Sequence, residues 1–363
     1  MVVSLGKVMS GERADKTSFL NKLQTTNNKL LINMVEERFL EAVEKYELVK
    51  RKDKIILGVS GGPDSVCMLH LFCNIKTRFN LNLICAHFNH CLRKEADSEE
   101  EFVRDLCKEL KIRFVSDKKN VEKFFRGDSL EQTARNLRLD FFLKCARQFK
   151  IKKLAVAHNK DDVVETMLMR IIRGTALKGL RGILPKSKFR GVTFIRPLIE
   201  TRKKEVLKWL SENSVSYRID KTNFENKFFR NKIRLKLLPL LKQFNPNITG
   251  SLFNLSRVTS LDYEFIYNFA REKFNQLKKR QGKDYVKLDL ETIKKFSRPI
   301  VFNVLRLAIE ELKGDTRRLE LKHIEQALDL IYRKCPLSKI DLPGLEIRKE
   351  DEWLVIGLCR NSL

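Results

Sequence analysis

Short apolar runs and amphipathic stretches alternate along the chain from residue 55 to residue 173. The apolar runs have the length and composition of buried strands, and the stretches between them have the apolar spacing of helices. Strands are predicted at residues 55–59, 83–88, 113–115 and 154–158. Helices are predicted at about residues 64–77, 97–110, 129–149 and 161–173. Because strand–helix repeats build parallel sheets, the pattern predicts an α/β fold with a doubly wound parallel sheet and ligands beyond the carboxyl ends of its strands.

The pattern becomes mainly helical after Arg196. Amphipathic helices are predicted at residues 201–213 and about 227–243, and the sequence Asn-Pro-Asn at 245–247 then interrupts the chain. Helical spacing resumes beyond this break. Alternation of apolar and polar residues predicts one strand at 285–288 and, at the end of the chain, a small β-meander.

Three parts follow from these patterns. Residues 1–33 are polar, basic and weakly patterned, so we expect a disordered leader. A periodic helix begins at Met34, which is therefore an alternative translation start, and mass spectrometry of natively expressed protein would test it. We expect an α/β domain at residues 34–245 and a mainly α-helical domain with a small β tail at residues 246–363.

The charge balance of the chain indicates a polyanionic partner. Lysine and arginine number 73 against 46 acidic residues, which gives a net charge of +27. An enzyme that acts only on small molecules has no need for such an excess, whereas nucleic acid would be attracted by it. The alternative is a basic surface that serves only solubility.

The cysteines and the apolar segments restrict the class of protein. None of the eight cysteines forms a Cys-x-x-Cys pair, so the spacing of a structural zinc site or an iron–sulfur site is missing, and most should be reduced core residues. There is no run of about twenty apolar residues and no secretory signal. We therefore expect a cytoplasmic protein without membrane association.

The most informative motif joins the first predicted strand to the helix that follows it. The turn reads Ser60-Gly61-Gly62-Pro63-Asp64-Ser65. Its glycines permit close approach of the backbone, and Pro63 suits the first position of a helix. Backbone amides and the positive end of the helix would then face an anion. No lysine follows the glycines, so a Walker-type phosphate grip is excluded and another nucleotide chemistry is indicated; the alternative is a plain glycine-rich turn.

A polar segment follows the second predicted strand. It begins at His87 and runs through His90 and Cys91 to Arg93. Polar side chains on such loops are often functional. A metal site is one alternative, although no fourth ligand lies nearby, and a histidine that caps the strand end structurally is another.

The helix predicted to begin near Ser129 carries two arginines on one face. Arg135 and Arg138 are three residues apart, which places them side by side. Such arginines suit a phosphate or a nucleic-acid base. Glu131 precedes Arg135 by four residues, so an ordinary surface ion pair is the alternative.

Two carboxylates follow the strand that ends at His158. Asp162 and Glu165 share one face of the next helix and could hold Mg²⁺ or an ammonium group. Acidic residues also stabilise helix N-termini without any further function. Further along, Arg173 leaves this helix, and Arg230 and Arg234 lie in a stretch without acidic residues; both basic segments suit phosphate contact, with a solvated helix face as the alternative.

Taken together, the order and spacing of these motifs resemble the tRNA(Ile)-lysidine synthetases, members of the PP-loop ATP-pyrophosphatases with the adenine nucleotide alpha hydrolase-like fold. The resemblance covers about residues 34–245, extends more loosely to the C-terminal part, and leaves out residues 1–33. Leu139 and the pair Val163 and Val164 depart from the usual family residues but lie beside the charged positions. Since the chain ends soon after Gly357, we expect it to lack the additional C-terminal module of longer members. The motifs that carry the resemblance are Ser60 to Ser65, His87 to Arg93, Glu131 to Arg135, His158 to Thr166, Arg173-Gly174 and Arg230 to Arg234.

The resemblance implies a reaction. Free L-lysine is joined to C2 of the wobble cytidine of the isoleucine tRNA with a CAU anticodon, and ATP is cleaved to AMP and pyrophosphate through an adenylated cytidine. ATP and Mg²⁺ are the implied cofactors, and the oligomeric state stays open, with a homodimer among the alternatives.

The resemblance also implies roles for individual residues. ATP binding falls to Ser60, Gly61, Gly62, Pro63, Asp64 and Ser65, with Asp64 the leading Mg²⁺ ligand. Lysine binding falls to His158, Asp162 and Glu165. Contacts to phosphate or tRNA fall to Arg93, Arg135, Arg173, Arg230 and Arg234. The residues expected to be catalytic are Asp64, His158, Asp162 and Arg138.

Three other functions are alternatives. A tRNA thiolase of the same superfamily normally needs a Cys-x-x-Cys pair, which is missing. An amidating synthetase such as one that makes NAD or GMP fits the loop but not the charge of +27. A non-catalytic RNA-binding relative would explain the charge but would form no AMP.

Overall fold

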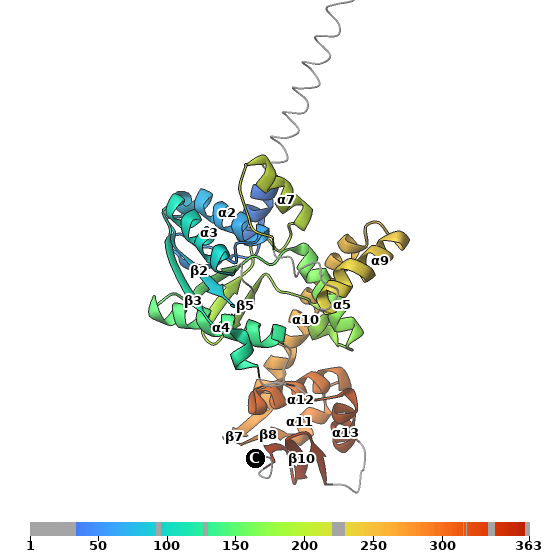
Figure 1. Ribbon diagram of the computed structural model, residues 1–363. Coiled ribbons are helices and arrows are strands. Elements are labelled where there is room, and N and C mark those ends of the chain that lie inside the picture. Colours follow the sequence, from blue (N-terminus) through green and yellow to red (C-terminus); the bar gives the residue numbers. More distant parts are fainter. Residues whose placement is uncertain are drawn as a thin grey trace, which may run out of the picture. The chain divides into compact units, whose positions relative to one another are not determined.

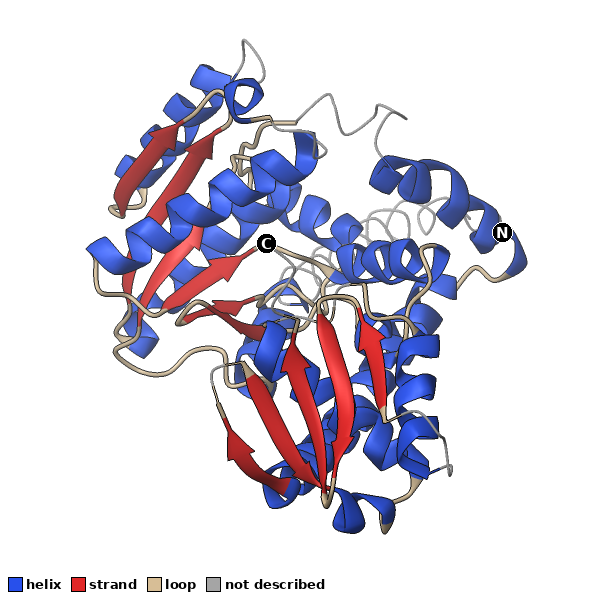
Figure 2. Cartoon of the chain, turned by 90° about the horizontal axis from the view of Figure 1, so that it is seen from below, coloured by secondary structure: helices blue, strands red, loops and turns tan. Residues whose placement is uncertain are grey.

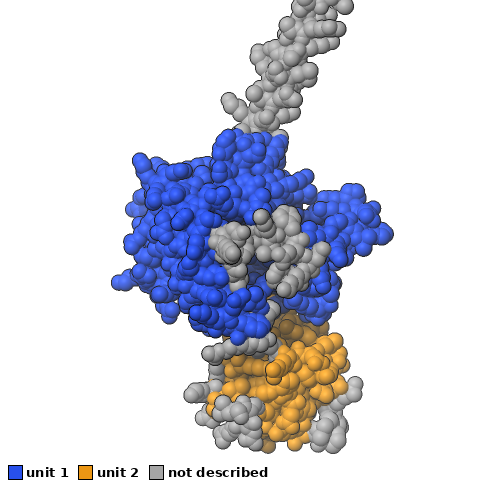
Figure 3. Space-filling view, in the orientation of Figure 1, with its two compact units in different colours: residues 1–256 blue, residues 257–363 orange. Residues whose placement is uncertain are grey.

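The computed structural model divides the chain into two compact units, residues 1–256 and residues 257–363 (Figure 3). The expected leader at residues 1–33 lies outside the residues that the structure describes. The described residues are 34–91, 96–125, 130–219, 229–282, 284–314, 316, 318–332 and 338–359, without the side chains of 279–281. The boundary between the units falls within one long helix, α10, which spans Ile248–Leu277.

A six-stranded sheet forms the centre of the first unit, and its strands appear as arrows in Figure 2. The strand order is β3-β2-β1-β4-β6-β5. All neighbouring strands are parallel except β5 and β6, which form an antiparallel hairpin. The strands are β1 (Lys54–Gly58), β2 (Asn82–Asn89), β3 (Arg113–Lys118), β4 (Lys153–Val156), β5 (Lys186–Phe189) and β6 (Val192–Ile195).

Helices cover both faces of this sheet. The helix over residues 34–45 packs on one face with α2 (Pro63–Phe79), α3 (Ala96–Glu109) and α7 (Lys203–Glu212). The other face is covered by α4 (Leu130–Gln148), as Figure 1 shows. Alternate residues of a strand point to opposite faces, so both faces of the central strand β1 are apolar and buried.

A smaller apolar cluster lies beside the sheet. It joins α5 (Lys160–Ile172) to the short helix α8 (Phe229–Lys232), a π-helical turn at Ile233–Leu237, and α9 (Leu238–Phe244). Pro239 lies in the first turn of α9, where its ring would clash with the carbonyl four residues earlier in a regular helix. The wider π turn that precedes it accommodates this clash. The remaining short elements of the unit are a 3₁₀ turn at Val121–Phe124 and α6 at Leu177–Leu180.

The second unit combines helices with a five-stranded antiparallel sheet in the order β7-β8-β11-β10-β9. Its apolar core lies between that sheet and the helices. The strands are β7 (Lys278–Gln281), β8 (Tyr285–Asp289), β9 (Lys339–Leu342), β10 (Leu345–Glu350) and β11 (Trp353–Leu358). The helices, besides the end of α10, are α11 (Leu290–Lys294), α12 (Arg298–Lys313) and α13 (Leu321–Tyr332).

The predicted fold class is confirmed: a doubly wound parallel sheet is followed by a helical region with a small antiparallel sheet. Two features differ from the expectation. The β5–β6 hairpin was missed because its strands are short and β5 is rich in lysine. The C-terminal meander is also not a separate tail, because β11 pairs with β8 and so extends the sheet. No helix among the described residues is long and apolar enough to cross a membrane.

Candidate functional site

The strand order reverses between β1 and β4, and this switch point lies beside the motif that begins at Ser60. In doubly wound sheets, ligands bind at the carboxyl edge of the strands where the order reverses. A side chain at Gly58 would meet the ring of Phe142 at 2.9 Å, so the end of β1 has room only for glycine. Gly61 has a φ of +85°, which favours glycine and turns the chain from the strand into α2.

The loop is closed by its own serines. The hydroxyl of Ser65 donates to the carbonyl oxygen of Gly62 at 2.9 Å, and the amide of Ser60 donates to the same hydroxyl at 3.1 Å. Gly62 precedes α2 and has no side chain to cap it. The first-turn amides of α2 are therefore left to face a ligand, and the helix end favours an anion there.

Asp64 lies at the start of α2 and contacts two other elements. Its carboxylate forms an ion pair with the ammonium of Lys203, at the start of α7. Its Oδ1 also accepts a hydrogen bond of 3.0 Å from Nδ2 of Asn159, which follows β4. Burial raises the pKa of Asp64, and Lys203 opposes this rise. Three chain segments are therefore joined around one carboxylate.

Asn159 and Asp162 cap α5 reciprocally. The side chain of Asn159 accepts a hydrogen bond of 3.0 Å from the amide of Asp162. The carboxylate of Asp162 accepts one of 2.9 Å from the amide of Asn159. This capping box fixes the turn between β4 and α5. Asp162 therefore stabilises the start of a helix, which the sequence analysis gave as the alternative to ligand binding.

The two predicted lysine-binding carboxylates are paired with two of the predicted phosphate-binding arginines. Glu165 is almost fully buried, with 1% of its surface exposed. It accepts hydrogen bonds of 2.7 Å from Nε of Arg230 and 2.6 Å from Nε of Arg234. Asp162 accepts a further bond of 2.8 Å from Arg230. The resemblance implied lysine binding for the two carboxylates and phosphate or tRNA binding for the two arginines. The structure places all four side chains in one ion-pair cluster.

His158 lies at the end of β4 among positive charges. Burial lowers the pKa of its ring well below the usual 6.5, and Arg196, Arg230 and Arg138 lower it further. Its Nδ1 is buried and has no hydrogen-bond partner among the described residues. The imidazole is therefore neutral at pH 7 and has a hydrogen-bonding position left for a ligand.

Three arginines without a carboxylate partner lie close to His158. Arg135 and Arg138 come from α4, and Arg196 follows β6; the described part of the chain shows no ion pair to any of them. Burial and the charge of Arg135 lower the pKa of Arg196 to about 10. Burial also lowers the pKa of Arg138, and Arg135 and Arg230 lower it further. Glu131, also among the described residues, opposes this shift at Arg138 but forms no ion pair with it, and cations gathered in this way favour the binding of an anion.

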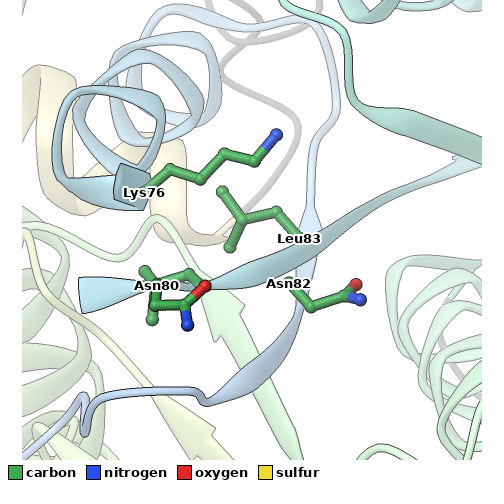
Figure 4. A pocket seen from close by; sticks show the side chains of 5 residues that line it. Lys76, Asn80, Asn82 and Leu83 are labelled. Atoms are coloured by element: carbon green, nitrogen blue, oxygen red, sulfur yellow. The ribbon is translucent and has the colours of Figure 1, made fainter. Parts of the chain in front are cut away.

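A cavity of about 1100 Å³ collects these groups. It is lined by residues from the Ser60 loop, the His158 turn, α4 and the β5–β6 hairpin, all within the first unit. Its volume is large enough for a nucleotide together with another substrate group. A second, smaller pocket of about 270 Å³ lies where α2 ends and β2 begins, and of the residues that the structure describes, Lys76 is the one charged side chain that lines it (Figure 4).

The other predicted residues are placed differently. His87 lines the cavity but is buried, and its Nδ1 lies 2.9 Å from the carbonyl oxygen of Val59, which supports the structural alternative. Arg173 lies over the ring of Phe229 at 5.1 Å and does not line the cavity. Arg93 and the expected cap Ser129 lie outside the described residues. Within the described ranges, no cluster of three or more metal-binding side chains occurs.

Sequence reasoning missed Lys203 and Arg196 and gave no role to Asn159. Lys203 lies in the first turn of α7, where the helix dipole disfavours a cation, so its position was a usable signal. No local pattern in the sequence identified Arg196, because its place in the cavity depends on how β6 pairs within the sheet.

Two protein families match the chain. The PP-loop domain matches residues 31–241, and the TilS substrate binding domain matches residues 288–355. The first match covers the sheet, the Ser60 loop and the arginines of α8 and the π turn. The second lies within the second unit.

Curated relatives cover most of the chain. The tRNA(Ile)-lysidine synthase of Caldanaerobacter subterraneus is 38% identical over 311 residues, which are 85% of this chain and 65% of that protein. The protein of the same name from Clostridioides difficile is 38% identical over 89% of this chain and 70% of its own length. The bifunctional protein TilS/HprT of Listeria monocytogenes is 35% identical over 85% of this chain and 48% of its own length. The chain thus spans about two thirds of the length of the first two.

A solved structure shares the fold. The U34-tRNA thiolase NcsA from Methanococcus maripaludis has a TM-score of 0.56 and 20% sequence identity. The match covers 64% of this chain and 80% of the thiolase. It supports the PP-loop fold of the first unit.

Proposed function

Because the chain belongs to the tRNA(Ile)-lysidine synthase family, we propose that it joins free L-lysine to C2 of the wobble cytidine in the isoleucine tRNA with a CAU anticodon. The reaction consumes ATP and releases AMP and pyrophosphate through an adenylated cytidine. The net charge of +27 suits a tRNA substrate. A cytoplasmic location follows from that substrate.

One observation carries the proposal: the hydrogen bond of 3.0 Å from Asn159 to Asp64. It joins the loop expected to bind ATP to the turn expected to bind lysine. Both segments therefore line one cavity, as a reaction between an activated cytidine and an amine requires.

The first step activates the cytidine. Its C2 oxygen attacks the α-phosphorus of ATP, and pyrophosphate leaves. The loop from Ser60 to Ser65 and the start of α2 bind the phosphates through backbone amides. Arg138 lies on the cavity wall without a carboxylate partner, where its charge stabilises the negative charge that develops on the phosphoryl group.

Magnesium fits this loop as a partner of the nucleotide. Mg²⁺ commonly binds proteins through one or two carboxylates and the substrate phosphates, so the single carboxylate of Asp64 is sufficient. Lys203 neutralises that carboxylate in the structure and would turn to a phosphate when Mg²⁺ binds. Bound Mg²⁺ would neutralise charge on the leaving pyrophosphate.

The second step transfers lysine. Its neutral side-chain amine attacks C2 of the adenylated cytidine, and AMP leaves with the former C2 oxygen. Asp162 and Glu165 are expected to bind the lysine, and their present pairing with Arg230 and Arg234 means that the ammonium group must share or replace those contacts. The cluster is therefore expected to rearrange when lysine binds.

His158 is better suited to orienting the amine than to removing its proton. Its lowered pKa makes it a weak base, but its unpartnered Nδ1 can accept a hydrogen bond from a neutral amine. The sequence alone does not distinguish orienting the amine from accepting its proton.

The alternatives receive less support. A thiolase of this superfamily would need a cysteine pair or cluster near the cavity, and no described cysteine lines it. A non-catalytic RNA-binding relative would have no use for a phosphate loop joined to Asp64, Lys203 and Asn159.

The test is incorporation of radiolabelled lysine. The protein is incubated with ATP, Mg²⁺ and labelled L-lysine, with transcripts of the CAU-anticodon isoleucine tRNA and of the methionine tRNA. We expect label in the isoleucine transcript only, together with AMP and pyrophosphate. Tight tRNA binding without AMP formation would favour the non-catalytic alternative and contradict the proposal.

A further inference from the structure

The β5–β6 hairpin forms a wall of the large cavity. Ser187 and Phe189 are two residues apart on β5, so their side chains lie on the same face of the hairpin. Phe194 pairs with Ser187 across the hairpin and therefore shares that face. Arg196 follows Phe194 by two residues, which continues the face beyond the strand. All four residues line the cavity.

Arg196 is held rigidly at this wall but is not neutralised. Its Nη1 donates to the carbonyl oxygen of Leu184 at 2.7 Å and to the hydroxyl of Ser187 at 3.1 Å. Both acceptors are uncharged. Its Nε is buried and has no hydrogen-bond partner among the described residues. Burying a cation costs free energy unless a negative charge lies beside it. No carboxylate that the structure describes supplies that charge here, so the position of Arg196 suits an anionic ligand.

Phe189 adds an aromatic surface at the same wall. Its side chain is 42% exposed, although it lines the cavity. Arg190 lies over its ring at 5.3 Å, and Lys188 also lines the cavity. Unpaired RNA bases stack on exposed aromatic rings while nearby cations bind the phosphates. The hairpin offers both kinds of contact side by side.

The position of Arg196 favours RNA over ATP as the source of the phosphate. The ATP loop follows β1, whereas Arg196 follows β6, and β4 lies between these strands. Strands are spaced at about 4.8 Å, so the two strand ends are on the order of 10 Å apart. A phosphate bound by Arg196 therefore lies to one side of the triphosphate.

We propose that the β5–β6 hairpin and Arg196 hold the RNA strand beside the reacting pyrimidine. Phe189 stacks on a base, and Arg196 binds a backbone phosphate. This inference rests on the proposed function, which supplies the RNA, and it adds a contact region that the sequence motifs do not include.

The first test replaces Arg196 with glutamine. Affinity for the CAU-anticodon isoleucine transcript is measured over a range of salt concentrations, and ATP affinity is measured by calorimetry without RNA. For Arg196→Gln we expect RNA binding roughly tenfold weaker, a salt-dependence slope smaller by about 1, and unchanged ATP affinity. Arg78→Gln removes a cation from the exposed end of α2 and is expected to leave RNA affinity unchanged.

The second test replaces Phe189. Phe189→Ala should weaken RNA binding by about tenfold through the loss of stacking, and Phe189→Tyr should restore it. Because Phe189 is exposed, its two variants should fold, and they test the contact with RNA even if Arg196→Gln does not fold. A thermal unfolding curve shows whether each variant is folded.

Two results would overturn the inference. One is wild-type RNA affinity in folded Arg196→Gln and Phe189→Ala proteins. The other is weakened ATP binding with intact RNA binding, which would assign Arg196 to the nucleotide. Failure of the proposed function looks different, because the wild-type protein would then bind the transcript without transferring lysine.

Discussion

Arg234 holds the carboxylate of Glu165 by two contacts, from Nε to Oε1 at 2.6 Å and from Nη2 to Oε2 at 2.9 Å. Arg230 adds a third contact, of 2.7 Å, to Oε2. Arg234 lies on the π turn and Arg230 on the preceding helix, so a local irregularity of the backbone positions this cluster. Irregular helical turns of this kind often occur at functional sites. Any ligand that uses Glu165 must therefore compete with two guanidinium groups.

Removal of this carboxylate should destabilise the protein. Glu165→Ala removes the buried carboxylate that both arginines contact and leaves them only Asp162 among the described carboxylates, so we expect the free energy of unfolding to fall by about 2–3 kcal/mol. This is below the usual cost for a fully buried pair because Arg230 and Arg234 keep 24% and 38% of their side-chain surfaces exposed. Urea unfolding measures the change, with the exposed Glu101→Ala on α3 as the control. Equal unfolding midpoints for the two variants would contradict the structural role of the cluster.

Asp64 should be required for ATP chemistry but not for RNA binding. In Asp64→Ala, pyrophosphate release should fall by at least a hundredfold because the proposed Mg²⁺ ligand and a contact to Asn159 are lost together. The affinity for tRNA should change little. Asp105→Ala on the exposed face of α3 is the matched control. Retained turnover in Asp64→Ala would refute the metal assignment.

Lys203 should shift the pH dependence of activity through Asp64. Burial raises the pKa of Asp64 above its usual value and Lys203 opposes this, so Lys203→Gln raises that pKa further. If Asp64 holds Mg²⁺ as proposed, it must be ionised to do so, and the acid limb of kcat/KM for pyrophosphate release should therefore move to higher pH. Lys204→Gln, one residue along α7, should leave the limb in place. A limb that moves to lower pH in Lys203→Gln would show that another group controls it.

His158 should make stability depend on pH. Its pKa is lower in the folded protein than in the unfolded chain, so below about pH 6.5 the unfolded chain takes up a proton that the folded protein does not. Stability is therefore lost as the pH falls, by at most about 2 kcal/mol at pH 5 from this residue. His158→Gln should remove that part of the loss.

The measurement compares urea unfolding of the wild-type protein and His158→Gln at about pH 8 and pH 5. The difference at the higher pH gives the cost of the substitution itself, because the ring is neutral there in both states. An identical loss of stability between the two pH values in both proteins would mean that His158 is protonated in the fold.

The sequence was sufficient for features that depend on local patterns. The apolar runs around Ile55 and Leu83 predicted the strands, and the glycines after Ser60 predicted the turn, because each is determined by neighbouring residues. The order of the motifs predicted the family, which the comparisons with known proteins confirm.

Features that depend on long-range contacts could not be predicted in this way. Lys203 meets Asp64 across 139 positions of sequence, and Arg234 meets Glu165 across 69. No local pattern identifies either partner, so the sequence analysis gave Lys203 no role and assigned Glu165 and Arg234 to different ligands. The β5–β6 hairpin was missed for a related reason: its apolar residues are few, and it is stabilised by the neighbouring strand β4.

In the proposed reaction, one cavity binds the triphosphate at residues 60–65 and lysine at the turn after β4. The most direct test is a crystal structure with a non-hydrolysable ATP analogue, Mg²⁺ and L-lysine. We expect phosphates on the amides of Gly61 and Gly62, Mg²⁺ on Asp64, and the lysine amine beside His158 and Asp162. A triphosphate bound away from residues 60–65, or lysine bound outside this cavity, would contradict it.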